Sequence, residues 1–490
     1  MTTTSPTPPG SSHTERTPLL LPEIEGQMIA AQTEHAQKVS AHQALYDRFS
    51  RSQKIRIVTL VAFTGLIPLF IVDSFVPSIP RMAEDLHSTA VVISLAVSIS
   101  AFAGSIGTLF WATYSGFYGR RIIYLISLPL VTIGSFGVGA SRSVTALMCW
   151  RVVQAFAGSA GMSLGAGVIG DIYKLEERGT AMGIFYSAVL LGPAMAPIAG
   201  GFTAHYSSWR VMQYAIGLAG LIMSVSMYAA FPETSHPGAL GVDRLTAEQR
   251  EKRGPVLLNP FASLALLRSP NLAAVTFATA TALLADFVLV VPIASTLGAR
   301  YNITNEAAIG ACFIPLGVGN FVGAPIAGWI SDRQIIKWRA RRGGVWLPED
   351  RLRATLAGSL ILVPVAMLLC GWATVFVDGW PGLAMNLVGF FLTGLGVDLV
   401  LPPVGSYAVD ILHDRSAEIS AATAAARNIF IALCLPAVLP LIGTIGVGWT
   451  NTISAVLAWI GAGLLLLTIR HGKAMRQWVD VGFTTSEESN

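Results

Sequence analysis

The chain has 490 residues, of which 53% are hydrophobic and only 12% are charged. Soluble globular proteins carry about 25% charged residues, so this composition excludes an ordinary soluble domain and predicts a protein of the lipid bilayer. The net charge of +4 does not indicate a nucleic-acid-binding protein, because the basic residues form no patch with interleaved aromatic residues. The four cysteines lie in apolar runs without paired spacing, which is typical of packing residues: Cys149, Cys312, Cys370 and Cys434.

The amino-terminal residues 1–50 are polar and rich in Ser, Thr, Pro and Gly, so we expect a disordered cytoplasmic tail. No cleavable signal peptide precedes the first apolar run, which is therefore a retained span. Twelve apolar runs follow, each of a length that lets a helix cross the bilayer. They lie at about 57–79, 90–113, 122–140, 144–168, 180–203, 210–231, 271–297, 305–330, 353–375, 381–406, 417–442 and 445–469.

Six runs precede a polar stretch and six follow it, and the two halves echo one another. Asp73 precedes Pro77 in the first run as Asp286 precedes Pro292 in the seventh. We therefore predict an all-α membrane protein with twelve transmembrane helices in two pseudo-symmetric six-helix bundles, with the solute site between them at mid-depth. The expected organisation is a tail at 1–50, a first bundle at 51–231, a cytoplasmic linker at 232–270, a second bundle at 271–470 and a cytoplasmic tail at 471–490.

Lysine and arginine predict the orientation. Almost all of these residues that lie in loops fall on the side that holds both termini and the linker. The loops on the other side hold only Arg81, Arg142 and Arg300, with Arg210 at the border. Cytoplasmic loops are enriched in Lys and Arg, so we expect both termini and the linker in the cytoplasm.

A few polar side chains interrupt the apolar runs, and they are the candidates for substrate binding or proton coupling. A charged group within the bilayer must face the bundle interior or a wet cavity. We expect Asp73 and Arg151 to form a pair that loads and releases a proton, although a static ion pair that fixes helix packing is the alternative. A guanidinium beside an amide on the eleventh run suits a solute with carboxylates, and a packing role is the alternative there too. The candidates are Asp73, Arg151, Gln154, Asp286, Asp398, Arg427 and Asn428.

A ladder of small residues and prolines marks the fifth run, and it lets a neighbouring helix approach closely. Its members are Gly183, Gly192, Pro193, Pro197, Gly200 and Gly201. No Walker A pattern, metal cluster or nucleophile–base arrangement is visible, so an ATP-driven pump or an enzyme is not expected, nor is a cofactor.

At these residues the chain resembles the major facilitator superfamily, specifically its fungal twelve-spanner drug:proton antiporters, over about residues 55–470. The fifth-run ladder matches the antiporter signature with Ala196 replacing one glycine, and Arg151, Gln154 and Ala155 resemble the fourth-run signature. In the family this arginine is associated with proton transfer. The loop signatures that resemble the family's gating loops are Gly119, Arg120 and Arg121 after the second run, and Gly328, Asp332 and Arg333 after the eighth. Gly116 stands where the first of these loops has an aspartate in the family.

The resemblance implies a secondary active transporter that exports a small organic solute, an organic acid or a drug-like metabolite, by proton antiport with alternating access. Proton-coupled uptake of a nutrient and a non-transporting membrane sensor are the alternatives. We expect a small-molecule substrate, protons and the lipid bilayer as partners, no nucleic acid and a monomeric protein. We place this multi-pass protein in the plasma membrane, with the vacuolar or endosomal membrane as the alternative.

Overall fold

The computed structural model describes residues 46, 48–173, 175–235, 240–244, 256–412 and 415–483. The chain from Arg51 onward forms one unit. The tail predicted for 1–50 lies outside the described residues except for Tyr46 and 48–50, and so does the end of the carboxyl-terminal tail from 484.

Helices make up the described chain, which contains no strand. The first half contains α2 (Arg51–Asp73), η1 (Val76–Ser78), α3 (Ile79–Asp85), α4 (Ala90–Tyr118), α5 (Arg120–Ala140), α6 (Val144–Ile172), α7 (Leu175–Tyr206) and α8 (Trp209–Ala230). The short helices η2 (Gly241–Arg244) and η3 (Ala262–Arg268) lie in the linker. The second half contains α10 (Pro270–Val290), η4 (Ala294–Gly298), α11 (Glu306–Ala311), α12 (Ile314–Arg341), η5 (Pro348–Thr355), η6 (Gly358–Leu362), α13 (Val363–Phe376), α14 (Gly379–Asp398), α15 (Leu401–Ile411), α16 (Ser416–Cys434), η8 (Leu435–Ala437) and α17 (Val438–Trp478).

Ten stretches of the described chain are long and apolar enough to cross a membrane. One of them, Glu418–Trp478, holds two helices, because Gly446 interrupts it with a φ of +84° that favours glycine. Dividing this stretch in two gives eleven spans, and the 32-residue α7, which is not among the ten stretches, is the twelfth. The fold is therefore the expected all-α membrane architecture of twelve transmembrane helices.

Proline residues divide several of these spans into shorter helices. The first span breaks between α2 and α3, where Pro77 lies in η1. The seventh breaks after α10 at Pro292, and the tenth divides into α14 and α15 before Pro402. A proline cannot donate the backbone hydrogen bond of a helix interior, which explains the position of each break.

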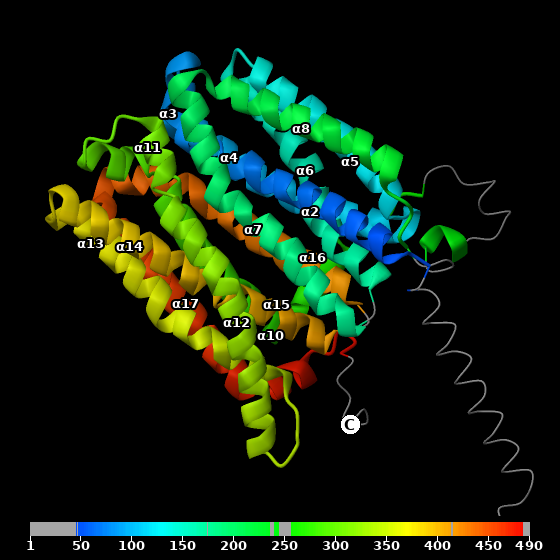
Figure 1. Ribbon diagram of the computed structural model, residues 1–490. Helices are drawn as coiled ribbons and strands as arrows, with labels where there is room; N and C mark the ends of the chain where they lie inside the picture. The colour runs from blue at the N-terminus through cyan, green and yellow to red at the C-terminus, as the bar shows by residue number, and fades with distance from the viewer. Residues whose placement is uncertain are drawn as a thin grey trace, which may run out of the picture. The chain divides into compact units, whose positions relative to one another are not determined.

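The helices form two bundles that pack side by side (Figure 1). In the first bundle α4 packs on α6, α5 on α8, and α2 on α7. In the second bundle α12 packs on α14, and α10 and α13 pack on α17. Contacts between the bundles run from α4 to α16 and from α7 to α11 and α12. The two bundles therefore meet along these three helix pairs.

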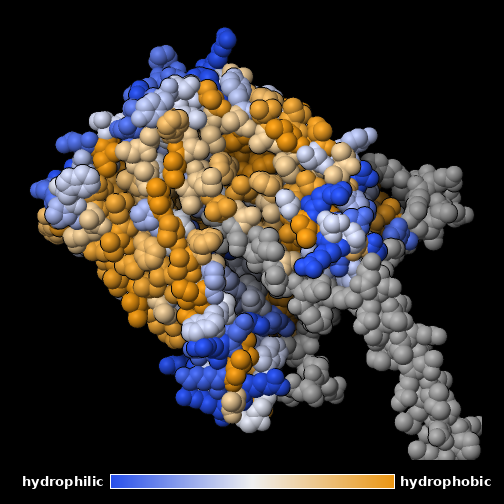
Figure 2. Space-filling view, viewed as in Figure 1, coloured by the Kyte–Doolittle hydropathy of each residue, from blue (hydrophilic) through white to orange (hydrophobic). Residues whose placement is uncertain are grey.

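Large apolar side chains cover the outer flanks of the bundles, and hydrophilic residues gather toward the helix ends (Figure 2). Phe63 is 56% exposed, Phe376 is 74% exposed and Trp380 is 81% exposed. Apolar surface on this scale is unfavourable in water and favourable against lipid chains. The structure is thus that of an integral multi-pass membrane protein.

Candidate functional site

The helix ends form two faces. The face that carries Arg120, Arg351 and Arg476 is called the basic face, and the face that carries Arg81 and Glu306 is called the opposite face.

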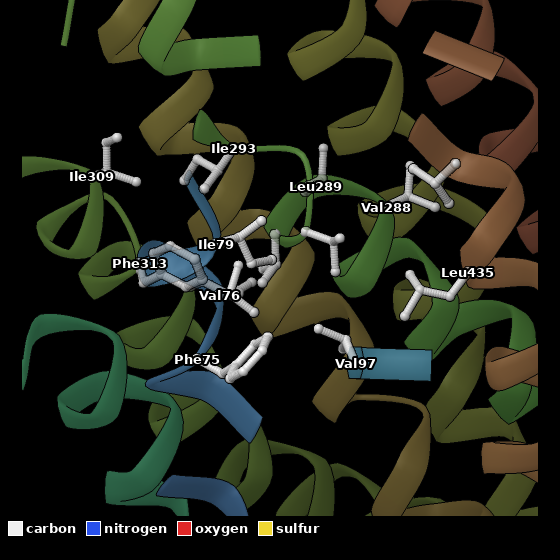
Figure 3. Packing of buried hydrophobic residues seen from close by; sticks show 14 of the residues in the cluster. Phe75, Val76, Ile79, Val97, Val288, Leu289, Ile293, Ile309, Phe313 and Leu435 are labelled. Atoms are coloured by element: carbon white, nitrogen blue, oxygen red, sulfur yellow. The ribbon is translucent and has the colours of Figure 1, made fainter. Parts of the chain in front are cut away.

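An apolar cluster of both bundles, here the apolar seal, lies toward the opposite face (Figure 3). Its labelled members are Phe75, Val76, Ile79 and Val97 of the first bundle, and Val288, Leu289, Ile293, Ile309, Phe313 and Leu435 of the second. Near the basic face, a cluster that joins the bundles buries Leu109, Ala421 and Ala425. Large side chains bury more apolar area than alanines do, so the bundles are held together more firmly near the opposite face.

A cavity of about 330 Å³ lies between the bundles, beside the apolar seal. Its wall is mostly apolar and comes from both bundles, with Ile71, Val97, Met162 and Val189 of the first facing Phe287, Val290 and Leu316 of the second. A concave, largely apolar pocket with a few polar groups is the usual form of a small-molecule site. The cavity is therefore the candidate binding site.

Three carboxyl groups line this cavity. Asp73 is the last residue of α2, Asp398 is the last residue of α14, and Asp286 lies one turn before the end of α10. Asp286 and Asp398 are each only 9% exposed. One oxygen of each, Oδ1 of Asp286 and Oδ2 of Asp398, is buried without a hydrogen-bond partner in the described chain. Each acid thus sits just before a helix break, as sites in transporters with discontinuous helices do.

One guanidinium faces the same cavity. Arg427 and Asn428 lie on α16 and both contribute to the wall. The Arg427 Nε has no hydrogen-bond partner among the described residues. The second-bundle candidates Asp286, Asp398, Arg427 and Asn428 are therefore brought together as the sequence predicts.

Arg151 does not line the cavity. It is 0% exposed on α6, and its Nη1 donates to the Ile71 carbonyl oxygen and to Gln154 Oε1, both at 2.9 Å. Its guanidinium also lies 4.3 Å from the centre of the Phe75 ring. The Ile71 carbonyl is open to Arg151 because the helix break turns the Phe75 N–H to Val72 instead. The expected pair with Asp73 is not formed among the described contacts.

Gln154 extends this internal network into the first bundle. Its Nε2 donates to Ser135 Oγ at 2.9 Å and to Gln213 Oε1 at 3.0 Å. Gln154 is 0% exposed and Gln213 is 1% exposed, so each amide needs the other as a partner. Gln213 is a polar residue in the sixth apolar run that the sequence reasoning missed, although its isolation there is the signal.

The ladder on α7 packs closely against helices of both bundles. A Cβ on Gly192 would lie 2.7 Å from Leu69, and one on Gly200 would lie 2.1 Å from the Ser74 carbonyl oxygen, both in the first bundle. A Cβ on Gly201 would lie 2.3 Å from the Glu306 carbonyl oxygen of the second bundle.

Two other members of the ladder touch the second bundle or the cavity. The Pro197 carbonyl oxygen abuts Gly310 of α11, and Pro193 lines the cavity. Gly183 lies on α7 toward the basic face. Small residues at these positions let α7 approach its neighbouring helices closely.

An ionic cluster at the opposite face, here the latch, ties the two bundles together. Glu306 of α11 lies with Oε1 2.8 Å from Arg81 Nε of α3, and its Oε2 accepts from His205 Nδ1 of α7 at 2.6 Å. The sequence reasoning missed all three members, because they lie in separate spans and follow no spacing.

The predicted gating loop of the first bundle contacts its own bundle and the start of the linker. Gly119 has a φ of +103°, and the Glu233 carboxylate accepts from the backbone N–H groups of Arg120 and Arg121 at 3.0 Å each. Arg120 Nε lies 3.1 Å from Asp171 Oδ2. Burial raises the pKa of Glu233, but the hydrogen bonds from Ser235, Arg120 and Arg121 outweigh it and hold this pKa below its ordinary value.

The second bundle repeats this arrangement with one more acid. Arg351 Nε lies 2.5 Å from Asp410 Oδ2, and its Nη1 lies 3.2 Å from Asp332 Oδ1. The position of Asp332 in the loop signature corresponds to Gly116 in the first bundle, so Arg120 lacks that second carboxylate. Arg333 lies over the Trp329 ring at 3.7 Å, and a Cβ on Gly328 would meet nothing within 4 Å.

Comparison with known proteins identifies the family of the chain. The family model described as Major Facilitator Superfamily matches residues 58–433. The chain is 26% identical to the efflux pump radE of Floropilus chiversii, with 86% of this chain and 80% of that protein covered. It is 27% identical to the MFS transporter cpaT of Aspergillus oryzae, covering 87% and 88%, and 23% identical to the MFS antiporter QDR3 of Candida albicans, covering 87% and 79%.

A solved structure shares the fold. It is the bacterial homologue of the human lysosomal transporter Spinster, in an inward-facing and unoccupied conformation. The TM-score is 0.63 at 15% identity, with 87% of this chain and 99% of that chain covered. The chain therefore belongs to the Major Facilitator Superfamily and is a membrane transporter rather than an enzyme.

Proposed function

We propose that this transporter exports a small organic solute in exchange for protons, by alternating access of the cavity between the two bundles. The observation that carries the proposal is the set of buried carboxyl groups in that cavity, at the ends of broken helices. Ionisable groups inside a membrane protein that face a cavity mark solute and proton pathways. The antiporter-type ladder on α7 and the similarity to an efflux pump and an antiporter support export.

The conformation supports alternating access. The apolar seal and the latch close the cavity toward the opposite face, and both join residues of different bundles. Rocking the bundles apart there must break the latch and separate α7 from α11. The same motion brings the helix ends of the basic face together, so one site is offered to each side in turn.

Orientation and assembly complete the proposal. The basic face lies in the cytoplasm by the distribution of Lys and Arg, with both termini and the linker on that side. The proposed boundaries are the two bundles at 51–231 and 271–470 and the linker at 232–270. The carrier works as a monomer, because the two bundles of one chain enclose a complete cavity, and we place it in the plasma membrane. Microscopy of a fluorescent fusion and light scattering in detergent test these two points.

Export is tested in cells that overproduce the wild type or the Asp286→Asn variant. Untargeted mass spectrometry compares the solutes of the medium with those of the cells. We expect at least one solute to be enriched in the medium and depleted in the cells for the wild type only. The reverse pattern indicates uptake, and no difference indicates a protein that does not transport.

Proton coupling is then tested with that solute in proteoliposomes. An acidic lumen must drive solute accumulation, because protons that leave the lumen are exchanged for solute that enters. Accumulation that instead requires an acidic exterior contradicts antiport.

A further inference from the structure

We infer that the basic-face end of α12 binds the headgroups of anionic phospholipids through one exposed face of the helix. This face carries Arg333, Ile336, Lys337 and Arg341 and is called the basic stripe below. The inference goes beyond the proposed function, because it concerns a surface outside the cavity and does not depend on the cargo. It uses the proposed function only for the orientation, which places the basic face in the cytoplasm, where the leaflet is rich in anionic lipid.

The helix α12 is too long to lie wholly within the bilayer. It has 28 residues, so at a rise of about 1.5 Å per residue it measures about 42 Å, whereas the hydrocarbon core is about 30 Å thick. In addition, α11 already forms the start of the same span on the opposite face. The last turns of α12 therefore protrude from the basic face, where hydrophilic side chains cover most of the protrusion (Figures 1 and 2).

The basic stripe continues the face of α12 that contacts lipid chains. The lipid-facing side chains recur every three or four residues and are partly exposed: Val318, Val322, Ile326 and Trp329. Residues at that spacing share one face of a helix. The same spacing leads from Trp329 to Arg333 and then to Lys337. Tryptophan is enriched where the hydrocarbon core meets the headgroups, so the basic stripe begins at the level of the headgroups.

The side chains of the basic stripe lean back toward the bilayer. The Cα–Cβ bonds of a helix tilt toward its amino terminus, which for α12 lies toward the opposite face, on the membrane side of the protrusion. Lys337 lies about 12 Å along the helix from Trp329, and headgroups occupy about 5–8 Å beyond the hydrocarbon core. Long basic side chains bend toward polar headgroups, so Lys337 reaches them, and Arg341 acts within the Debye length of about 8–10 Å.

The three cations of the basic stripe are not neutralised by the described chain. The nearest carboxylates are paired with other arginines: Asp332 Oδ1 lies 3.2 Å from Arg351 Nη1, and Asp350 Oδ1 lies 3.3 Å from Arg353 Nε. None of the three cations forms an ion pair with a described residue. Basic residues clustered just beyond a transmembrane helix are typical of surfaces that bind anionic lipid, because the leaflet supplies the missing negative charge.

An apolar side chain within the basic stripe favours a membrane surface as the partner. Ile336 lies between Arg333 and Lys337 on this face and is 69% exposed. Helices that lie at a membrane surface combine basic residues with apolar side chains that enter the boundary between headgroups and acyl chains. A face that meets only water gains nothing from such a side chain.

Lipid-selective quenching of fluorescence tests the inference. A bimane fluorophore is attached to Ile336→Cys in the full-length chain without its native cysteines, in nanodiscs of phosphatidylcholine. The nanodiscs contain an equal fraction of either phosphatidylserine or phosphatidylcholine that carries a nitroxide near the top of its acyl chain. We expect the phosphatidylserine nitroxide to quench the fluorophore more strongly, because the basic stripe enriches this lipid. Equal quenching by both lipids identifies a face that binds water or an acidic protein, and it overturns the inference.

Matched variants then assign the charges. Lys337→Gln should lower the enrichment of phosphatidylserine about fivefold, the scale of one basic residue near an anionic membrane, and the addition of Arg341→Gln should lower it further. Arg339→Gln is the control, since it removes the same charge from the other side of α12, where Nε donates to the Gly344 carbonyl oxygen at 3.0 Å. An equal loss in the control overturns the assignment to the basic stripe. A folding defect changes quenching by the phosphatidylcholine nitroxide too, which these variants should leave unchanged.

Salt provides a measurement that needs no further variant. The Debye length falls from about 10 Å at 0.1 M salt to about 3 Å at 1 M, so the selectivity for phosphatidylserine should decrease steeply over this range. Selectivity that is unchanged at high salt overturns the inference. Neither measurement involves transport. Equal quenching by the two lipids therefore leaves export and antiport standing, and failure of the export test leaves the lipid-binding surface standing.

Discussion

Glu306→Gln should shift the transporter toward the state that is open at the opposite face. Glu306 is the one residue through which Arg81 and His205 are joined in the latch, and its side chain is 8% exposed. A hydrogen bond between charged groups contributes about 1.5–3 kcal/mol when buried. The Arg81 side chain is 45% exposed, so solvent weakens its interaction with Glu306. We therefore take about 1–2 kcal/mol as the contribution of the whole latch to the stability of the closed state. That energy corresponds to a change of about 5- to 30-fold in the ratio of the two states.

The assay is electron spin resonance of two spin labels, one on each bundle at the opposite face. Cysteines replace Arg142 and Asp378 in a chain without its four native cysteines, and the distance distribution is measured in nanodiscs. We expect Glu306→Gln to increase the population of the longer distance. The matched control is Glu84→Gln, which removes a carboxylate 3.4 Å from Arg81 but within α3. An unchanged distribution in Glu306→Gln, or an equal change in the control, refutes the role of the latch.

Three further perturbations follow from the described contacts. Gly201→Val should abolish transport by forcing α7 from α11, while Gly463→Ala, where a Cβ meets nothing within 4 Å, should leave the flux intact; equal fluxes would contradict the close approach. Glu233→Gln should lower the unfolding temperature at pH 7, since an amide leaves one N–H group at the start of α5 unpaired. The difference from the wild type should vanish only below pH 4.5, the ordinary pKa of a glutamate. The carboxylate keeps its stabilising charge until the pH falls through its folded-state pKa, which lies below that value. Arg151→Met should destabilise the protein by about 1–3 kcal/mol in chemical denaturation, because the Ile71 carbonyl and Gln154 Oε1 lose their buried donor; a loss of flux at unchanged stability would instead indicate direct proton transfer.

The sequence predicts the twelve helices well because a bilayer imposes one strong condition, a long apolar run for each crossing. It also predicts that Asp286, Asp398 and Arg427 turn inward, since they are too polar for lipid, and they line the cavity; their role in transport stays a prediction. Local sequence patterns do not predict the partner of a side chain when that partner comes from a distant part of the chain. The Ile71 carbonyl becomes the partner of Arg151 because a helix break exposes it, and no side-chain pattern records a free carbonyl.

The latch shows the same limit. Arg81, His205 and Glu306 lie at the ends of three different spans, where charged residues are expected to face water. Their meeting depends on how α7 crosses α11, and that crossing depends on Gly201 and Gly310. Similarly, Arg351 joins Asp332 and Asp410 through a helix start whose position the loop signature alone does not give.

The charges of the cavity are divided unequally between the two bundles. Asp286, Asp398 and Arg427 come from the second bundle, and Asp73 alone comes from the first. The first bundle instead supplies the glycine ladder and the enclosed network around Arg151. We therefore expect the second half of the chain to determine selectivity and the first half to determine the mechanics of the motion. A chimera that joins the first bundle of this chain to the second bundle of a relative should inherit the cargo preference of that relative, while a graft of the first bundle should alter turnover.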